Sequence, residues 1–506
     1  MAVTVYTSSF NGIDGVEIEV EVDIKKGLPS FCIVGYGDTS IKEAKERVRS
    51  AVINSGFEFP LGRITVNLAP ADMRKEGAMF DLAIAIGILM SSNQILNTNI
   101  GEYILMGELS LNGLLKPVKG ILPTVINGLE KGICKYIIPY DNVDEVKYTE
   151  NAEIYPFNNL KEVVNYLSYN DLLPISKSMY SEIKEEYDVD FEDVIEQLAA
   201  KRAIEIAAAG NHNILLYGEP GSGKSMLAKR LKTILPSMSY EESIEVTRIY
   251  SITGMTKGKG IVKERPFRSP HHSITTAALV GGGIKAKPGE ITLAHKGVLF
   301  LDEILEFERN KLDLLRQPLE DKCIRIDRKN NSVKYPSDFV LIATMNPCKC
   351  GYYGSVKNQC KCSVIEVDKY LKRMSGPLLD RFDIIINLRA EDIDKGKRKE
   401  LGEKSKDIRK RVIEARDIQE KRFKYESINK NSAMEITHVK KYCNLNDMAE
   451  KYLSKIYKEY GISNRGYIKI IKVARTIADI NKREEITYAD IIEAVQYRKF
   501  VDGKVI

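Results

Sequence analysis

The sequence predicts an α/β protein with an N-terminal α/β domain, a central parallel sheet with helices on both faces, and a C-terminal helical part. Three observations lead to this prediction. Apolar and acidic residues alternate near the N-terminus, a glycine-rich turn follows an apolar strand in the middle of the chain, and the C-terminal part is rich in Lys, Glu and Ile but poor in Gly. We expect a domain over 1–165, a linker over 166–190, a nucleotide-binding core over 191–389 with a Cys-rich insertion at 346–363, and a helical lid over 390–506.

Length and composition are those of an ordinary globular protein. The chain has 506 residues, of which 43% are hydrophobic and 29% charged, with 35 Gly and 17 Pro, and these values exclude collagen-like, low-complexity and largely disordered chains. The longest apolar run, Leu82 to Met90, is far shorter than the roughly 20 residues of a membrane helix, and no Lys or Arg precedes Lys25. We therefore expect a cytoplasmic protein without a signal peptide or membrane span.

The N-terminal domain is predicted from two kinds of periodicity. Residues 16–24 alternate between apolar and acidic side chains, as in a strand with one face in water. Residues 41–54 carry apolar side chains at helical spacing, and Gly56 is the expected stop. A polar, acidic stretch after Tyr169 is typical of a linker. The mixed α/β pattern continues in four further apolar stretches, at 64–68, 80–90, 103–105 and 136–139.

The central core is predicted from strands that alternate with helices. Residues 199–210 have the small side chains of a packed helix, and residues 214–217 form a short apolar strand that leads directly into a glycine-rich turn. Further apolar strands are expected at 298–301 and 339–344. This alternation implies a parallel sheet, whereas the residues from 390 onward show only helical patterning.

The glycine-rich turn matches the phosphate-loop pattern G-x-x-x-x-G-K-[ST] at every fixed position. Its backbone N–H groups and the start of the following helix would bind phosphate oxygens of ATP. Lys224 would reach the β and γ phosphates, and the Ser225 hydroxyl would ligate Mg²⁺. A chance glycine turn is the alternative interpretation. The loop consists of Gly218, Glu219, Pro220, Gly221, Ser222, Gly223, Lys224 and Ser225.

Two adjacent acids, Asp302 and Glu303, end the apolar strand at 298–301. Carboxylates at such a strand end are costly unless they have a partner or a task, because burying unpaired charge costs several kcal/mol. We predict that Asp302 belongs to the Mg²⁺ shell and that Glu303 orients and deprotonates the attacking water. The alternative is a solvated strand end.

Three later polar residues are candidates for the same site. Asn346 ends the strand at 339–344 and is placed to orient the water or the γ phosphate. Arg381 is a candidate for an arginine finger from a neighbouring subunit, and Arg465 for a contact with the γ phosphate from the helical part. Spacing alone leaves ordinary surface or salt-bridged residues as an equal alternative for each.

The cysteines are concentrated in one place. The chain has eight, and four of them fall within 15 residues. In a cytosolic chain this favours a metal over disulfides, and four thiolates suit tetrahedral Zn²⁺, although C-x-C is a tighter spacing than usual. We predict a structural zinc site, with reduced, unmetallated thiols as the alternative. Its ligands would be Cys348, Cys350, Cys360 and Cys362.

Residues 190–383 resemble an AAA+ ATPase of the magnesium-chelatase-like branch, and the match is close to the YifB/ComM family (competence protein ComM). This resemblance implies that Asn346 is sensor 1, Arg381 the arginine finger and Arg465 sensor 2. Arg373 is a rival for the finger and Arg475 for the lid position. The resemblance is carried by the phosphate loop and by the stretches 200–210, 267–272, 289–295, 297–303, 345–348 and 375–383.

The N-terminal domain is similar to the proteolytic domain of Lon-type proteases, which use a Ser and Lys pair. Here Ala78 or Met79 stands at the serine position and Leu122 at the lysine position, so proteolysis has no nucleophile or base. We interpret this domain as a non-catalytic scaffold or a DNA-contacting collar. Its charged residues Asp72, Arg74, Lys75, Glu76 and Asp81 are interpreted as a solvated surface rather than an acid/base pair.

Two basic stretches are candidates for DNA contact. Residues 254–296 contain eight Lys or Arg and two acids, a net charge of +6 that equals the excess of the whole chain. Residues 324–334 alternate like a hairpin with a basic, Asn-rich tip. Such loops suit phosphates in the pore of a ring, and nothing in them would read bases. The alternative is a solvated basic loop without a ligand.

The leading hypothesis is an ATP-driven ring, expected to be a homohexamer, that moves along single-stranded or branched DNA in a sequence-independent way. Resemblance to YifB/ComM implies helicase and branch-migration activity during natural transformation and recombination. The main alternative is a chaperone-like or metal-chelatase-type ATPase that remodels a protein partner. An ATP-dependent protease is the weakest reading, since neither member of the dyad is present.

Overall fold

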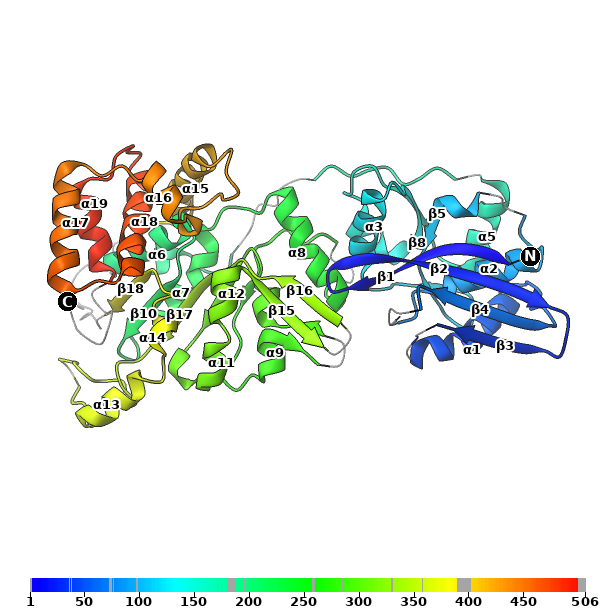
Figure 1. Cartoon of the computed structure of the whole chain (residues 1–506), viewed down its shortest axis with the longest axis horizontal. Coiled ribbons are helices and arrows are strands. Elements are labelled where there is room, and N and C mark those ends of the chain that lie inside the picture. Colours follow the sequence, from blue (N-terminus) through cyan, green and yellow to red (C-terminus); the bar gives the residue numbers. More distant parts are fainter. Residues whose placement is uncertain are drawn as a thin grey trace. The chain divides into compact units, whose positions relative to one another are not determined.

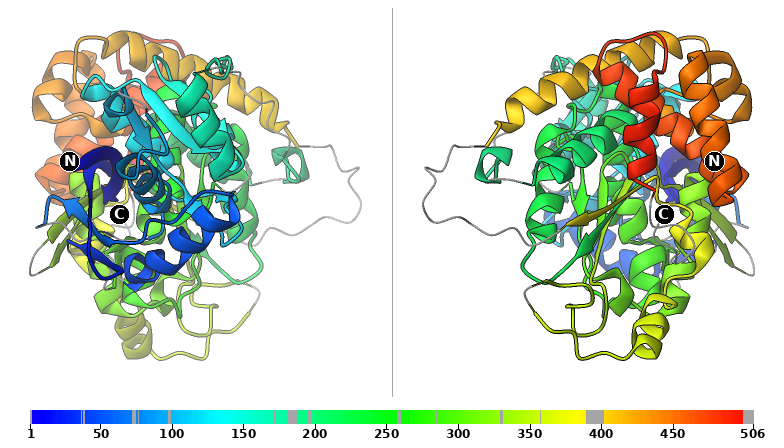
Figure 2. Two further views of the ribbon diagram at one scale, coloured as in Figure 1. Left: turned by 90° about the vertical axis from the view of Figure 1, so that its right-hand side faces the viewer. Right: turned by 90° about the vertical axis from the view of Figure 1, so that its left-hand side faces the viewer.

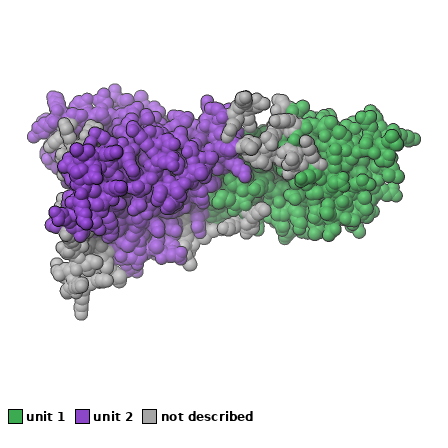
Figure 3. Space-filling model, turned by 90° about the horizontal axis from the view of Figure 1, so that it is seen from below, with its two compact units in different colours: residues 1–183, 239–263 green, residues 184–238, 264–506 purple. Residues whose placement is uncertain are grey.

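The computed structural model describes most of the chain as two compact units. Unit 1 comprises Met1–Ile183 and Ser239–Lys263, and unit 2 comprises Lys184–Met238 and Glu264–Ile506 (Figure 3). The described residues are 2–35, 37, 39–71, 75, 77–96, 99–170, 172–180, 187–194, 197–256, 260–283, 286–328, 331–356, 358–388 and 402–498.

Unit 1 is built on a seven-stranded mixed sheet (Figure 1). Its second strand confirms the predicted alternation, because Ile18, Val20 and Val22 are completely buried while Glu19 is exposed. Strands β3 and β4 run parallel, β2 is antiparallel to its neighbours β4 and β1, and the remaining pairs are parallel. In sheet order the strands are β3 (Ser30–Val34), β4 (Arg63–Ala69), β2 (Asp14–Lys25), β1 (Val3–Asn11), β5 (Tyr103–Leu105), β8 (Lys135–Pro139) and β9 (Glu153–Phe157).

Helices cover this sheet. The most buried is α2, which is apolar on all sides and packs against β1 and β2. Gly87 permits this approach, since a Cβ at that position would lie 2.6 Å from Val22 Cγ2. Predicted helix 41–54 is confirmed as α1. The helices are α1 (Thr39–Asn54), α2 (Asp81–Ser91), α3 (Ile121–Glu130), α4 (Val143–Val146) and α5 (Leu160–Tyr169).

A helix from the middle of the chain also belongs to unit 1. Helix α8 (Tyr240–Thr253) packs against α3, and Ser251 Oγ accepts a hydrogen bond of 3.1 Å from Gly120 N. Thr256 Oγ1 donates to Glu145 at 3.0 Å. The sequence places these residues inside the predicted core 191–389, so the division by contacts differs from the predicted linear division.

Unit 2 contains a five-stranded parallel sheet, which bears out the predicted fold class. Strand β10 is buried along its whole length, as expected for a parallel strand covered on both faces. Helices α6 (Leu198–Gly210) and α7 (Lys224–Ile234) pack against it. In sheet order the strands are β11 (Phe267–Arg268), β14 (Val298–Leu301), β17 (Val340–Met345), β10 (Ile214–Gly218) and β18 (Ile384–Leu388).

The C-terminal helices, coloured gold to red in Figure 2 (right), share one hydrophobic core with this sheet. Helix α15 packs against α6 and α7, and α18 packs against α6, α15 and α19. Across the residues with a described placement, no helix has both the length and the apolar character that crossing a bilayer requires. The helices are α15 (Ser405–Arg422), α16 (Ile436–Tyr442), α17 (Asp447–Tyr460), α18 (Asn464–Ile480) and α19 (Tyr488–Gln496).

Candidate functional site

The phosphate loop joins β10 to α7, as its position in the sequence predicts. Two glycines explain its conformation. Gly223 caps α7 at φ 84°, a left-handed conformation that favours glycine. A Cβ at Gly218 would lie 2.2 Å from the carbonyl oxygen of Leu388, so only glycine fits between the adjacent strands. The loop thus enters the N-terminus of α7, where free N–H groups and the helix dipole favour an anion.

Lys224 is almost completely buried beneath the loop. Its ammonium group donates to the carbonyl oxygens of Gly218 at 2.8 Å and Glu219 at 2.6 Å. Burial lowers the pKa of Lys224, while the charges of Asp302, Glu303 and Glu219 act in the opposite direction. A buried ammonium group held only by neutral carbonyls and more distant carboxylates would gain from a directly bound anion.

Asp302 follows β14 and lies at the centre of a set of oxygen atoms. Ser225 Oγ donates to its two carboxylate oxygens at 2.9 and 3.0 Å, and Thr344 Oγ1 donates to Oδ1 at 2.5 Å. Within the described part of the chain, no basic side chain forms an ion pair with Asp302. Carboxylate and hydroxyl oxygens are the donor set that Mg²⁺ prefers.

Thr344 is a functional residue that sequence reasoning missed. It is completely buried in β17, where it accepts a hydrogen bond of 2.9 Å from Glu303 N while donating to Asp302. A single polar residue within the apolar strand predicted at 339–344 was the available signal. Its hydroxyl therefore links the two predicted acids.

Glu303 is exposed and adopts φ 50°, a left-handed conformation that non-glycine residues rarely take. This turn directs the chain away from β14 immediately after Asp302. Strand β17 lies between β10 and β14 in the parallel sheet. Asn346 follows β17, so it lies at the carboxyl ends of the strands, as do the phosphate loop and the two acids. The topology thus brings together four of the predicted features.

The two candidate arginines meet elsewhere in unit 2. Arg381 forms an ion pair with Glu320 of α12 (Arg316–Asp321) and donates to the carbonyl of Pro377 at 3.1 Å. Arg465, at the start of α18, lies 3.8 Å from the same Glu320 carboxylate. Among the described residues, neither guanidinium contacts the phosphate loop of its own chain.

The two alternative arginines, Arg475 and Arg373, differ in how far their side chains are exposed. Arg475 is 1% exposed, and its guanidinium is bonded to Asp479 and to the carbonyls of Arg483 and Glu484, so burial excludes it from a phosphate contact. Arg373 has a half-exposed side chain that donates to Leu305 O at 2.9 Å. It stays an alternative for the finger.

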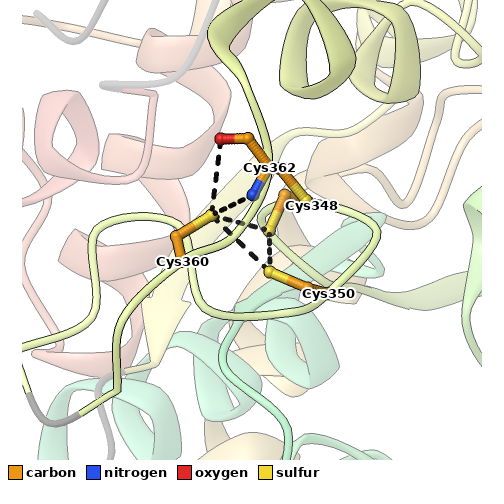
Figure 4. Close-up of side chains that lie close together, drawn as sticks. All are labelled: Cys348, Cys350, Cys360 and Cys362. Carbon is orange, nitrogen blue, oxygen red and sulfur yellow. Dashed lines mark hydrogen bonds between the residues drawn. The ribbon is translucent and has the colours of Figure 1, made fainter.

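The four clustered cysteines come together after β17 (Figure 4). All four sulfur atoms lie within 4.8 Å of one another, and the Sγ–Sγ distances are 3.3 Å for Cys348–Cys350, 3.5 Å for Cys350–Cys360 and 3.7 Å for Cys348–Cys360. Backbone N–H groups of Tyr352 and Lys361 lower the pKa of the Cys350 thiol to about 6, whereas burial and the neighbouring thiols raise the pKa values of Cys360 and Cys362 against one backbone hydrogen bond each. Thiolates around one point are a metal-ligand set.

The whole chain has relatives that match this organisation. It is 40% identical over 504 residues to competence protein ComM of Haemophilus influenzae, covering 98% of this chain and 97% of ComM. The YifB proteins of Salmonella typhimurium and Escherichia coli are 41% identical over 497 and 496 residues, each covering 98% of this chain and 96% of YifB. The chain belongs to the ComM/YifB family of magnesium-chelatase-like proteins.

Family models match three successive parts of this ComM/YifB-family chain. A model described as subunit ChlI of Mg-chelatase matches residues 20–142, one described as magnesium chelatase, subunit ChlI, matches 190–395, and its C-terminal model matches 402–498. Residues 190–395 contain the phosphate loop, Asp302 and the cysteine cluster. Membership of this AAA+ branch indicates ATPase activity and implies ATP and Mg²⁺ as nucleotide and metal.

In this family member, the basic stretch 254–296 contributes residues to both compact units. It is divided between the two units after Lys263. Arg265 donates to three backbone carbonyls, Arg268 pairs with Glu290 at 2.6 Å, and Lys296 lies 3.6 Å from Asp338. Most described cations here therefore stabilise the fold. Lys257, Lys259 and Lys285 lie outside the described residues.

The predicted hairpin is confirmed as β15 (Cys323–Arg328) and β16 (Asn331–Pro336). Ile324 and Val333 are buried on one face, whereas Arg325 and Lys334 lie directly opposite each other on the exposed face. Two like charges in that arrangement repel, so an anion between them would be stabilising. The hairpin tip, residues 329–330, lies outside the described residues.

A second hairpin lies beside the first. It consists of β12 (Gly281–Gly282) and β13 (Lys287–Pro288). Tyr335 Oη donates to Ala286 O at 2.9 Å, and a Cβ on Gly281 would lie 2.9 Å from Ile326 Cδ1. The second hairpin, which carries exposed Lys287, therefore packs against the buried face of β15 and β16, opposite the face of Arg325 and Lys334.

The N-terminal unit holds no protease dyad at the predicted positions, since Met79 and Leu122 are both buried in its apolar core. The interpretation of its charged residues as a solvated surface is wrong for Lys75 and Asp81, which are completely buried. Arg47 donates to Asp81 at 2.8 and 3.1 Å, and Lys75 donates to the carbonyl of Pro70. These partners make burial possible. The other three charged residues, Asp72, Arg74 and Glu76, lie outside the described residues.

Proposed function

We propose that this ComM/YifB-family chain is a cytoplasmic ATP-driven ring motor that acts on DNA, as a helicase or branch-migration factor in natural transformation and recombination. The observation that carries the motor part is Asp302, a carboxylate at the end of β14 that is held by the hydroxyls of Ser225 and Thr344 and, among the described residues, forms no direct ion pair. The name of the relative ComM, a competence protein, supports the DNA part.

Hydrolysis would use the loop and the strand ends together. Lys224 and the loop N–H groups bind the phosphates, and Ser225 and Asp302 hold Mg²⁺, which neutralises charge on the transferred phosphoryl group. Glu303 accepts a proton from the attacking water, and Asn346 orients that water. Thr344 fixes the position of the Asp302 carboxylate relative to the backbone of Glu303 through its two hydrogen bonds.

The arginines would complete the site of the next copy. Arg381 and Arg465 share Glu320 in one chain, so both can move together to a γ phosphate presented by a neighbour. A phosphate carries more negative charge than one carboxylate and would compete well for both guanidinium groups. A closed ring, expected to be a hexamer, places one such pair at every seam.

DNA would be held by the two adjacent hairpins. Arg325, Lys334 and Lys287 are exposed cations, and we propose that they contact the phosphate backbone, so that binding would be independent of sequence and would depend on salt. We also propose that the cysteine cluster holds one structural Zn²⁺, because four thiolates leave no open coordination position.

A junction assay tests this function. Full-length protein with ATP and Mg²⁺ is expected to migrate labelled three- and four-way DNA junctions, and Glu303→Gln is expected to bind ATP without migrating them. Arg325→Ala/Lys334→Ala is expected to lower DNA-stimulated turnover and to reduce the salt slope of DNA binding by roughly 2. Lys451→Ala/Lys458→Ala, on exposed α17 positions, is the matched control. No DNA binding at low salt and no stimulation would contradict the DNA assignment.

The description of the matching family models as magnesium chelatase subunits favours a second candidate, an ATPase that remodels a protein partner. This function predicts ATP turnover that DNA leaves unchanged and junctions that stay intact. The same assay therefore separates the two candidates.

A further inference from the structure

The cysteine cluster touches the nucleotide site. Ser355, which lies between the two cysteine pairs, donates from Oγ to Glu219 Oε2 at 2.8 Å. Gly351 approaches the next loop residue so closely that a Cβ would lie 2.5 Å from Pro220 Cγ. Both contacted residues belong to the phosphate loop.

The segment that makes these contacts has little structure of its own. Within the described residues of 346–363, no helix or strand is present between β17 and α13 (Val364–Leu371). Side chains and turns alone position a stretch of this length poorly, because each ordered residue costs about 1–2 kcal/mol of backbone entropy. A tetrahedral ion would join its two ends, since Cys348 and Cys350 precede the contacts and Cys360 and Cys362 follow them.

The sulfur geometry fits such an ion. Zinc–thiolate bonds of about 2.3 Å in a tetrahedron place sulfur atoms about 3.8 Å apart. The three Sγ–Sγ distances of 3.3, 3.5 and 3.7 Å are near that value. Cys348 is buried and the other three cysteines are partly buried, so the cluster is partly shielded from bulk water.

We infer that this cysteine knuckle, residues 348–362, is a metal-dependent brace for the phosphate loop: bound Zn²⁺ fixes Gly351 and Ser355 against Pro220 and Glu219 and thereby raises the affinity for nucleotide. This inference rests on the proposed zinc site and not on the proposed action on DNA. Ser355 is a positioning residue, because it acts on the loop through Glu219. The brace holds the loop before ATP arrives, so its loss would weaken nucleotide binding more than turnover.

The first test is metal content of the purified full-length protein by elemental analysis. Wild type is expected to contain one Zn per chain, and Cys360→Ser none. Cys134→Ser is the matched control, since Cys134 is an isolated, exposed thiol that should leave zinc unchanged. Iron in place of zinc, a disulfide within the cluster, or full zinc retention in Cys360→Ser would overturn the metal assignment.

The second test is coupling, measured with a fluorescent ATP analogue and with turnover in the absence of DNA. Ser355→Ala is expected to keep its zinc, raise Kd and KM for ATP about fivefold, equivalent to about 1 kcal/mol, and leave kcat within about twofold. Ser363→Ala removes a hydroxyl that caps α13 and serves as the control.

Removal of zinc from wild type with a chelator should raise Kd at least as much, and ZnCl₂ should restore it. This arm keeps the inference testable if Cys360→Ser fails to fold. Unchanged nucleotide affinity in both the chelated protein and Ser355→Ala would overturn the brace, while leaving action on DNA to its own assay.

Discussion

Asp302 in unit 2 and Asp81 in unit 1 are two carboxylates with different surroundings, the first half-buried and the second completely buried. Asp81 is completely buried and receives two hydrogen bonds from the Arg47 guanidinium and one, of 3.3 Å, from Leu109 N. Asp302 receives hydrogen bonds from two neutral hydroxyls, those of Ser225 and Thr344. Asp81 is bonded directly to a cation, whereas the described hydrogen bonds to Asp302 come from neutral hydroxyls and the Lys224 ammonium acts on it without a direct ion pair.

This difference distinguishes structural charge from functional charge. The bonded Arg47 guanidinium offsets part of the cost of burying the Asp81 carboxylate, and this buried pair belongs to the fold of unit 1, away from any substrate. A carboxylate with only hydroxyl donors keeps most of its field directed at the adjacent space, where a cation gains from it. The comparison predicts that changes at Asp302 affect chemistry and that changes around Asp81 affect stability.

The largest effect is expected for Asp302→Asn. Replacement of the charged ligand removes several kcal/mol of support for Mg²⁺ and the transferred phosphoryl group, so ATP turnover should fall by about a hundredfold or more. Steady-state ATPase assays measure the loss, and thermal unfolding should change little. Asp417→Asn on the exposed face of α15 is the control. Normal turnover in Asp302→Asn would remove this residue from the site.

Arg47→Met should have the next largest effect, and on stability rather than turnover. It leaves Asp81 buried without a counter-charge, a change that costs about 3–5 kcal/mol. Calorimetry should show a lower Tm for unit 1, while turnover below that Tm stays near wild type. The double variant Arg47→Met/Asp81→Asn should recover much of the loss. An unchanged Tm in Arg47→Met would show that water reaches Asp81.

The two units should respond to pH in opposite directions. Burial raises the pKa of Asp81 to about 6 against the opposing hydrogen bonds of Arg47, so its folded value exceeds the unfolded value of 3.8. The contribution of Asp81 to the free energy of unfolding is therefore complete below about pH 4 and is lost as the pH rises through about 6.

In unit 2, burial raises the pKa of Asp383, but Lys469 and His212 outweigh this and hold it well below 3.8. That contribution is present above pH 4 and is lost as the pH falls further. Unfolding followed against pH in Asp81→Asn and Asp383→Asn tests both signs. Parallel pH profiles for the two variants would contradict the comparison.

Glu320→Gln should have the smallest effect. It weakens the ion pairs that hold Arg381 and Arg465 within one chain, and a partly exposed pair is worth about 0.2–1 kcal/mol. Turnover at low protein concentration, where assembly limits the rate, should rise by about twofold to fivefold because the arginines are free to reach a neighbour. Glu306→Gln, which weakens only the Arg373 pair, is the control. A fall in turnover would mean that Glu320 aligns the arginines for catalysis.

Several parts of this structure could be predicted from the amino-acid sequence. The phosphate loop was predictable because its glycines, Lys224 and Ser225 are consecutive, and a strand followed by a helix requires no distant partner. Strand β2 and helix α1 were predictable because burial of one face imposes a period on the side chains. The four cysteines were equally visible, since their spacing is local.

Other features depended on residues far apart in the chain. Sequence reasoning assigned Asp81 to a solvated surface because nothing local indicates that Arg47 covers it. It kept Arg475 as a candidate for the phosphate contact from the lid. The structure instead shows this side chain buried and hydrogen-bonded to Asp479 and to two backbone carbonyls. Sequence reasoning also named 254–296 as a candidate for DNA contact, whereas Arg265 and Arg268 in that stretch are bonded to backbone carbonyls and to Glu290.

By itself, the sequence determined the kinds of chemistry available: a loop for phosphates, acids at a strand end and thiols for a metal, each encoded in a short run of residues. Tertiary structure alone decided which charges are satisfied and which are free to act. It placed Thr344 between the two acids, Glu320 between the two arginines, and Ser355 against the phosphate loop. The physical reason is that short-range geometry follows from neighbours in the chain, whereas the field at a carboxylate depends on whichever distant side chains the fold brings to it.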